Sequence, residues 1–147
     1  MKFTKIVLTS FLLTATFPPS FLSQESNLLK PIVPAMELER AKKIKPAVDL
    51  RSPEIIEKGN RIFHGKGECY LCHGNNGKGD GIAAVGLDPS PRNFTNPKFK
   101  LARTPGEMFW VLKHGSPGRA MMSAIPGLIS EEEGWAVIAY ERSLGGD

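Results

Sequence analysis

One pentapeptide, Cys69-Tyr70-Leu71-Cys72-His73, constrains this chain more than any other feature. It contains the only two cysteines, and a histidine follows the second of them directly. This is the arrangement of c-type haem attachment. On a helical turn, thiols with this spacing lie against one edge of a porphyrin, and the next imidazole reaches the iron from one face. The motif therefore predicts one covalently bound haem c, attached through Cys69 and Cys72, with His73 as an axial ligand.

Other uses of the two cysteines fit the sequence less well. A structural zinc site needs a full set of protein ligands, and His64 and His114 would have to complete it. A thioredoxin-like pair would need a βαβ setting, which the sequence does not indicate. A disulfide would leave the adjacent histidine without a role. The pattern favours haem over all three.

A second ligand is expected on the opposite face of the iron. The candidates are Met121, Met122, His114 and His64. Methionine usually fills a core. This pair, however, lies in a predicted loop that begins at Gly115, where the helix backbone does not fix the direction of the side chain and a sulfur can turn toward the iron. His64 is too close to the attachment motif to reach the far face and is expected to face solvent. His114 ends a predicted helix, where its charge suits the negative end of the helix dipole.

Three strong helix starts predict an all-α fold. Ser52 precedes Pro53, a good first helical residue. Capping boxes at 104–107 and 130–133 begin two further helices. No segment alternates apolar and polar residues as a strand does. The long Gly- and Pro-rich passage from Gly74 to Arg103 predicts an irregular loop that wraps around a cofactor.

The N-terminal third is expected to lie outside the folded domain. Residues 1–23 begin with Lys2 and Lys5 and continue with an apolar run too short to span a bilayer, which predicts a signal peptide or an N-terminal anchor. Residues 24–50 are expected to be a proline-containing linker, with a helix from Ala35 to Ile44 as an option, and a solvated spacer rather than a docking segment. Residues 51–147 form the predicted domain. Export implies a periplasmic or other extracytoplasmic location, with membrane association through the N-terminus as an option.

The net charge of +4 does not indicate nucleic-acid binding. Cleavage of the first 23 residues would leave +2, because Lys2 and Lys5 would be lost. Two haem propionates would bring the total close to neutral. No basic run is interleaved with aromatic residues, as a nucleic-acid interface would require.

From about Ser52 to Leu144 the chain resembles the class I cytochromes c, particularly bacterial mono-haem domains. The resemblance is carried by segments 59–63, 69–74, 87–94, 110–116 and 130–144. It implies helices wrapped around one haem, with the first and last helices crossing so that Gly59 packs near Tyr140. It also implies His73 and a methionine as axial ligands. Alignment from Pro117 and Ala120 places Met121 on the ligand, whereas Met122 stands where the family commonly has proline.

The resemblance further implies residues that support the haem. A proline carbonyl of the Pro89/Pro91 segment is expected to accept the Nδ1 proton of His73, which fixes the ring and strengthens the ligand. Arg92 is expected either to pair with a haem propionate or to be solvated.

The function expected from this ligation is electron transfer. Histidine and methionine fill both axial positions, so no catalytic residue is predicted and the chain is not expected to be an enzyme. It would pass single electrons between redox protein partners, as a soluble carrier or as a subunit of a respiratory complex. The alternative is a haem enzyme or gas sensor with a displaceable sixth ligand. That alternative needs a distal acid–base residue, which His114 would have to supply.

Overall fold

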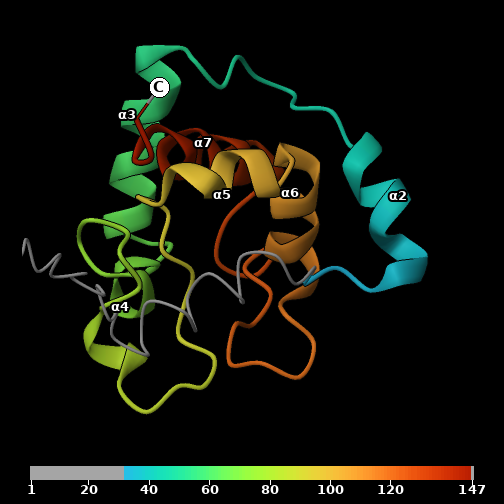
Figure 1. The fold of residues 1–147 in the computed structure, drawn as a ribbon. Helices are drawn as coiled ribbons and strands as arrows, with labels where there is room; N and C mark the ends of the chain where they lie inside the picture. The colour runs from blue at the N-terminus through green and yellow to red at the C-terminus, as the bar shows by residue number, and fades with distance from the viewer. Residues whose placement is uncertain (1–31, 147) are drawn as a thin grey trace, which may run out of the picture.

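The computed structural model describes residues 32–146, and these residues form helices and loops without a strand (Figure 1). The expected all-α architecture is therefore confirmed over this range. In chain order the elements are α2 (Ala35–Lys43), α3 (Pro53–His64), α4 (Tyr70–His73), the 3₁₀ helix η1 (Ile82–Ala84), α5 (Pro97–Ala102), α6 (Pro105–His114) and α7 (Glu131–Ser143). Within the described range, no helix has the length and apolar character needed to cross a membrane.

The three predicted helix starts are confirmed by their capping hydrogen bonds. Ser52 Oγ accepts from the backbone N–H of the third residue of α3. Thr104 and Glu107 form a reciprocal capping box, with bonds of 3.2 and 2.8 Å. Ser130 and Glu133 do the same at 3.2 and 2.9 Å. Each helix thus begins where a side chain satisfies backbone donors that lack an intrahelical partner.

The crossing of α3 and α7 organises the domain, and the two helices lie against each other in Figure 1. At the crossing, a Cβ on Gly59 would lie 1.9 Å from the carbonyl oxygen of Ala136 and 2.9 Å from Cβ of Tyr140. Only a residue without a side chain permits this approach. The crossing implied by the resemblance is confirmed, including the position of Gly59 beside Tyr140.

The main core lies between α3, α6 and α7. Phe63 of α3 is completely buried, and Phe109 of α6 stacks on Trp135 of α7 with centroids 4.1 Å apart. Phe94 from the long loop completes this core by an edge contact with Phe63. The loop is therefore anchored to the helices by an aromatic side chain.

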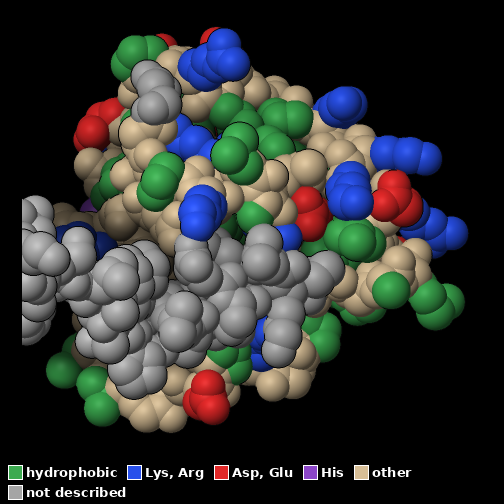
Figure 2. Space-filling model, viewed as in Figure 1, with side chains coloured by type: hydrophobic (Ala, Val, Ile, Leu, Met, Phe, Trp, Pro, Cys, Tyr) green, Lys and Arg blue, Asp and Glu red, His purple; other side chains and the backbone are tan. Residues whose placement is uncertain are grey.

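The prediction of a solvated spacer is wrong for residues 32–50, the described part of the expected linker. Residues 35–43 form α2, which packs along α6. Val33 and Ala41 are buried with Trp110 of α6 in a second apolar cluster. The outward face of α2 carries exposed ion pairs, and Figure 2 shows basic and acidic side chains together at this edge. The predicted signal peptide or anchor, residues 1–23, lies outside the described residues.

The long loop is also more structured than expected, because it contains η1 and α5. Asn96 Oδ1 accepts from Lys98 N at 2.9 Å, and Pro97 is the first residue of α5. This is the same combination of a polar cap and proline that predicted α3. The expectation of an entirely irregular loop from Gly74 to Arg103 is therefore wrong at this point.

Candidate haem-binding site

The attachment motif forms a single helical turn. Cys69 has helical backbone angles and immediately precedes α4, and Cys72 lies within α4. The backbone N–H of His73 donates to Cys69 O at 2.9 Å. Both cysteines are free, so no disulfide joins them. Residues three apart on a helical turn share a face, as attachment to one edge of a porphyrin requires.

A glycine-rich loop closes over this turn. Gly74 ends α4 with φ of +77°, a region that favours glycine. Gly79 N donates to His73 O at 2.8 Å, and Gly81 N donates to Cys72 O at 3.1 Å. The carbonyls at the end of α4 therefore have partners, and the turn that carries the motif is fixed from its C-terminal side.

The side chain of His73 is buried and held from two directions. Its ring stacks on Phe94, with centroids 4.5 Å apart. Its Nδ1 lies 3.0 Å from the carbonyl oxygen of Arg92. Burial lowers the pKa of His73, which favours the neutral imidazole. With Nδ1–H donating to this carbonyl, the lone pair of Nε2 is available to a metal.

The expected acceptor from the Pro89/Pro91 segment is wrong in detail, because the acceptor is the carbonyl of Arg92. A Cβ on Gly79 would lie 2.4 Å from Pro91 O, so the Pro91 carbonyl faces the glycine loop. The next carbonyl along the chain then faces His73. The backbone of Arg92, rather than that of a proline, orients the imidazole.

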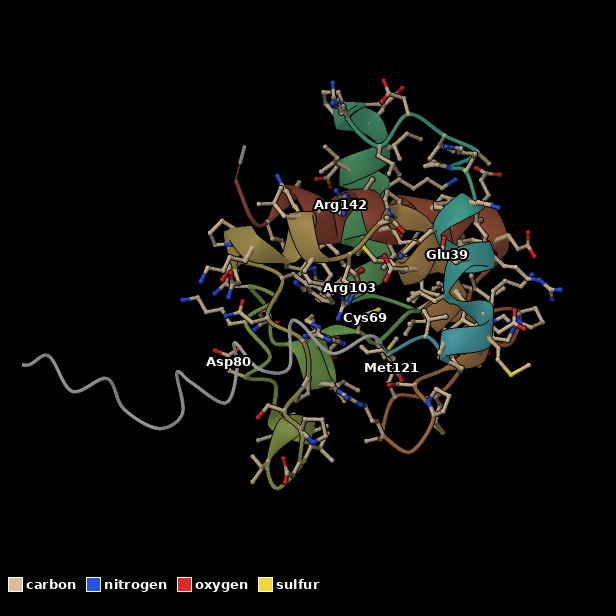
Figure 3. The ribbon with its side chains drawn as sticks, turned by 45° about the vertical axis from the view of Figure 1, so that its right-hand side comes forward. Glu39, Cys69, Asp80, Arg103, Met121 and Arg142 are labelled. Atoms are coloured by element: carbon tan, nitrogen blue, oxygen red, sulfur yellow. The ribbon has the colours of Figure 1, made fainter. Side chains whose placement is uncertain are left out.

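One cavity adjoins His73, with about 510 Å³ of empty space that is partly open to solvent. Its wall is mostly apolar and includes Met121, while Met122 is 84% exposed. In the view of Figure 3, Arg103 and Met121, which both line the cavity, project close to Cys69. The lining residues are Ile32, Val33, His73, Arg92, Phe94, Phe99, Arg103, Glu107, Met108, Val111, Leu112, Met121 and Glu141.

Basic side chains gather at the cavity. Arg92 and Arg103 both line it, and burial followed by the charges of Arg103 and Arg119 lowers the pKa of Arg92 to about 10. Converging guanidinium groups are suited to carboxylates, which accept their planar arrays of N–H donors. An apolar wall beside converging positive charge fits a flat apolar ring that carries two propionates. The residues present therefore fit haem.

Arg92 is the member of this group that the family resemblance implied, whereas Arg103 was not predicted. Arg92 is half-buried, with its guanidinium 6.0 Å from the centroid of the Phe99 ring, so the solvated alternative does not describe it. Arg103 follows α5 and precedes the cap of α6, and its side chain is buried. No local pattern distinguishes this arginine from the others of the chain.

Two acidic or weakly acidic groups near the cavity have raised pKa values. Burial raises the pKa of Glu141, a cavity-lining residue of α7, to about 8. Burial, with a smaller contribution from the charge of Glu141, raises the pKa of the Cys69 thiol to about 12. A thiol in this environment stays protonated, unlike the reactive thiolate of a dithiol redox motif. This argues against the thioredoxin-like interpretation.

The other two histidines lie outside the cavity lining. His64 is half-buried rather than solvated, which corrects the expectation for it. Its Nδ1 and Nε2 lie 3.0 and 2.9 Å from the carbonyl oxygens of Asn60 and Asn75. His114 is exposed at the end of α6, where it stacks on Trp110. The described residues contain no cluster of three or more His, Cys, Asp or Glu side chains suited to a metal ion, so the zinc alternative has no support there.

Comparison with known proteins agrees with this site. A model of the family described as cytochrome C oxidase, cbb3-type, subunit III matches residues 54–140. The chain belongs to this family of c-type cytochromes. The class I cytochrome c fold and a covalently bound haem c, both predicted from the sequence, are confirmed, and the domain has a haem-based electron-transfer role.

One solved structure is also similar to this cytochrome. It belongs to the Kuenenia stuttgartiensis reducing HAO-like protein complex Kustc0457/Kustc0458. The identity is 30% and the TM-score is 0.55, over 74% of this chain and 54% of that chain. The present chain thus spans about half the length of that relative. A search of curated proteins found no match.

Proposed function

We propose that this cytochrome passes single electrons between redox protein partners outside the cytoplasm. In this proposal it binds one haem c, attached through Cys69 and Cys72, with His73 and Met121 as the axial ligands. The protein would act as a carrier or as the electron-transfer subunit of a larger complex, and it would not itself catalyse a reaction.

The observation that supports this assignment is the composition of one cavity. His73 and Met121 both line it, although they are far apart in the sequence. The adjacent Met122 is exposed and is not among the residues of the cavity wall, which supports Met121 over it. A nitrogen donor and a thioether sulfur in one apolar cavity are the ligand pair of an electron-transfer haem.

The chain's own residues would position these ligands. Haem, when bound, supplies one-electron chemistry at its iron, and a thioether ligand favours Fe(II). The carbonyl of Arg92 orients His73. On the other side, Ser116 N donates to Met121 O at 2.9 Å, which closes the methionine loop. Arg92 and Arg103 would neutralise the propionates.

The haem enzyme or gas sensor is the less favoured reading because of the position of His114. A distal acid–base residue must reach the reacting group within hydrogen-bonding distance. His114 is exposed at the end of α6 and is absent from the cavity lining. This position of His114 supports electron transfer over the alternative.

The proposed location and partners depend on other observations. The basic and apolar start of residues 1–23 supports export, with tethering through the same segment as an option. The similar solved chain comes from a protein complex, which supports redox proteins as partners. Electron transfer needs only a small and transient docking surface.

Substitution of the two neighbouring methionines tests the ligand assignment. We expect Met121→Ala to lose the thioether-to-iron absorption band, to lower the reduction potential and to let imidazole bind, because water or imidazole stabilises Fe(II) less than a thioether does. Met122→Ala is the matched control and should change these properties little. A larger effect of Met122→Ala would shift the ligand by one residue. No effect of either substitution would contradict methionine ligation.

A further inference from the structure

The segment before the matched domain forms part of the cavity wall. Ile32 and Val33 are among the cavity-lining residues, and Val33 is only 3% exposed. The family match begins at residue 54, so these residues lie outside the part of the chain that the family model describes. The haem cavity of this chain therefore includes a wall that the matched domain does not supply.

This segment is fixed by a close approach of α2 to α6. A Cβ on Gly106 of α6 would lie 2.1 Å from the carbonyl oxygen of Ala41 and 2.7 Å from that of Ile44. Both obstacles are backbone atoms, so the approach depends on glycine. Ala41 is completely buried beside Trp110. The backbone at the end of α2 therefore contacts α6 directly, in addition to the side-chain contacts.

The contact between α2 and α6 continues into the cavity wall. Val111 of α6 lines the cavity and also packs against the cluster of Val33, Ala41 and Trp110. The opposite face of α2 carries exposed ion pairs between Glu37 and Arg40 and between Glu39 and Lys42. The helix is therefore amphipathic: its apolar side extends the cavity wall and its charged side faces water.

We propose that residues 32–44 form a clasp that closes one side of the haem cavity, with Val33 packing against the haem. This inference rests on the proposed function, since it assigns a further residue to the same site. Apolar surroundings limit the access of water to a metal centre and lower the local dielectric constant. Both changes affect the reduction potential of the metal. The clasp would keep the ferrous form favoured and shield the sixth ligand from exchange.

A direct test uses the unmodified holoprotein. In the reduced, diamagnetic state we expect nuclear Overhauser contacts between the methyl groups of Val33 and protons of the haem. The methyl group of Met36, which is 91% exposed on α2, is the internal control and should show none. Assigned Val33 methyl resonances without any contact to haem protons would overturn the proposal.

Variants test the consequence for the site. Val33→Ser removes the apolar contact, and Gly106→Val prevents the approach of Ala41 to α6. Both should retain covalent haem, show a lower reduction potential and bind imidazole faster than wild type, whereas Met36→Ser should match wild type. Wild-type potential and imidazole binding in both variants would refute the clasp. Absence of covalent haem from the wild-type protein would instead refute the proposed function, so the two failures are distinguishable.

Discussion

Replacement of Gly59 by alanine tests whether the α3–α7 crossing depends on a missing side chain. The new Cβ would lie 1.9 Å from Ala136 O, 2.6 Å from the carbonyl carbon of the same residue and 2.9 Å from Tyr140 Cβ. Real Cβ atoms essentially never approach other heavy atoms within 3.0 Å. The helices must therefore separate by about 1 Å or more, because the nearest obstacle is backbone and cannot rotate away.

Two opposing terms determine the size of the effect. Overpacking of a close contact costs about 1–3 kcal/mol, and an obstacle of backbone atoms places this site at the upper end. Alanine in place of glycine in a helix interior stabilises the folded state by about 1 kcal/mol. The net loss of unfolding free energy is then about 2 kcal/mol, which corresponds to a melting temperature lower by roughly 10 °C for a domain of this size.

Gly134→Ala in α7 is the matched control. It gains the same helix propensity, but its new Cβ would meet Cδ1 of Ile125 at 2.6 Å. That atom is the end of a side chain that can change rotamer, so we expect little net loss. Thermal unfolding of both haem-loaded variants, followed by far-UV circular dichroism, measures the difference. A melting temperature of Gly59→Ala equal to or above that of Gly134→Ala would refute the reasoning.

Two further predictions concern attachment and pH. Cys69→Ser or Cys72→Ser should weaken or abolish covalent haem, and a double variant that still shows normal haem staining on a denaturing gel would contradict the attachment assignment. Burial raises the pKa of Glu141 from near 4.5 to about 8, so between these values the folded state keeps a proton that the unfolded state releases. Stability should therefore fall as pH rises through this interval, by up to about 1.4 kcal/mol per pH unit. Denaturant unfolding should show this fall in wild type and its loss in Glu141→Gln; an equal fall in both would exclude Glu141 as its origin.

The features that sequence analysis predicted correctly are those encoded by neighbouring residues. The caps at Ser52, Thr104 and Ser130 each depend on side chains within one helical turn, so the local sequence contains the whole signal. The position of Gly59 against α7 is not local, and it came from the resemblance to class I cytochromes c. Structure confirmed it as a backbone contact with Ala136.

The wrong prediction for residues 32–50 has a different cause. Prolines and charges in this segment are typical of a linker, and its apolar residues are few. Burial of Ala41 depends on Gly106, which lies on a helix far along the chain and lets that helix come close. Nothing near Ala41 in the sequence signals this partner. The apolar side of α2 is buried only because α6 packs against it.

The acceptor for His73 shows how a prediction from the family resemblance fails by one residue. The Nδ1–H of His73 donates to Arg92 O, the carbonyl directly after the expected segment, and not to a proline carbonyl. Successive carbonyls of a loop face different directions, and the close approach of Gly79 to Pro91 O determines which one faces the imidazole. Such a register depends on packing between two loops, which residue types alone do not specify.

The methionine pair poses the same problem on the other side of the cavity. Met121 and Met122 are chemically identical, so residue type alone offers two sulfur atoms, and only the alignment from Pro117 and Ala120 favoured Met121. The loop separates them by exposure: Met121 lines the cavity and Met122 is 84% exposed. The bond from Ser116 N to Met121 O ties the start of this loop to its end. Because a ligand must reach the cavity as well as carry the right atom, the fold of residues 115–125 supports Met121 as the proposed ligand.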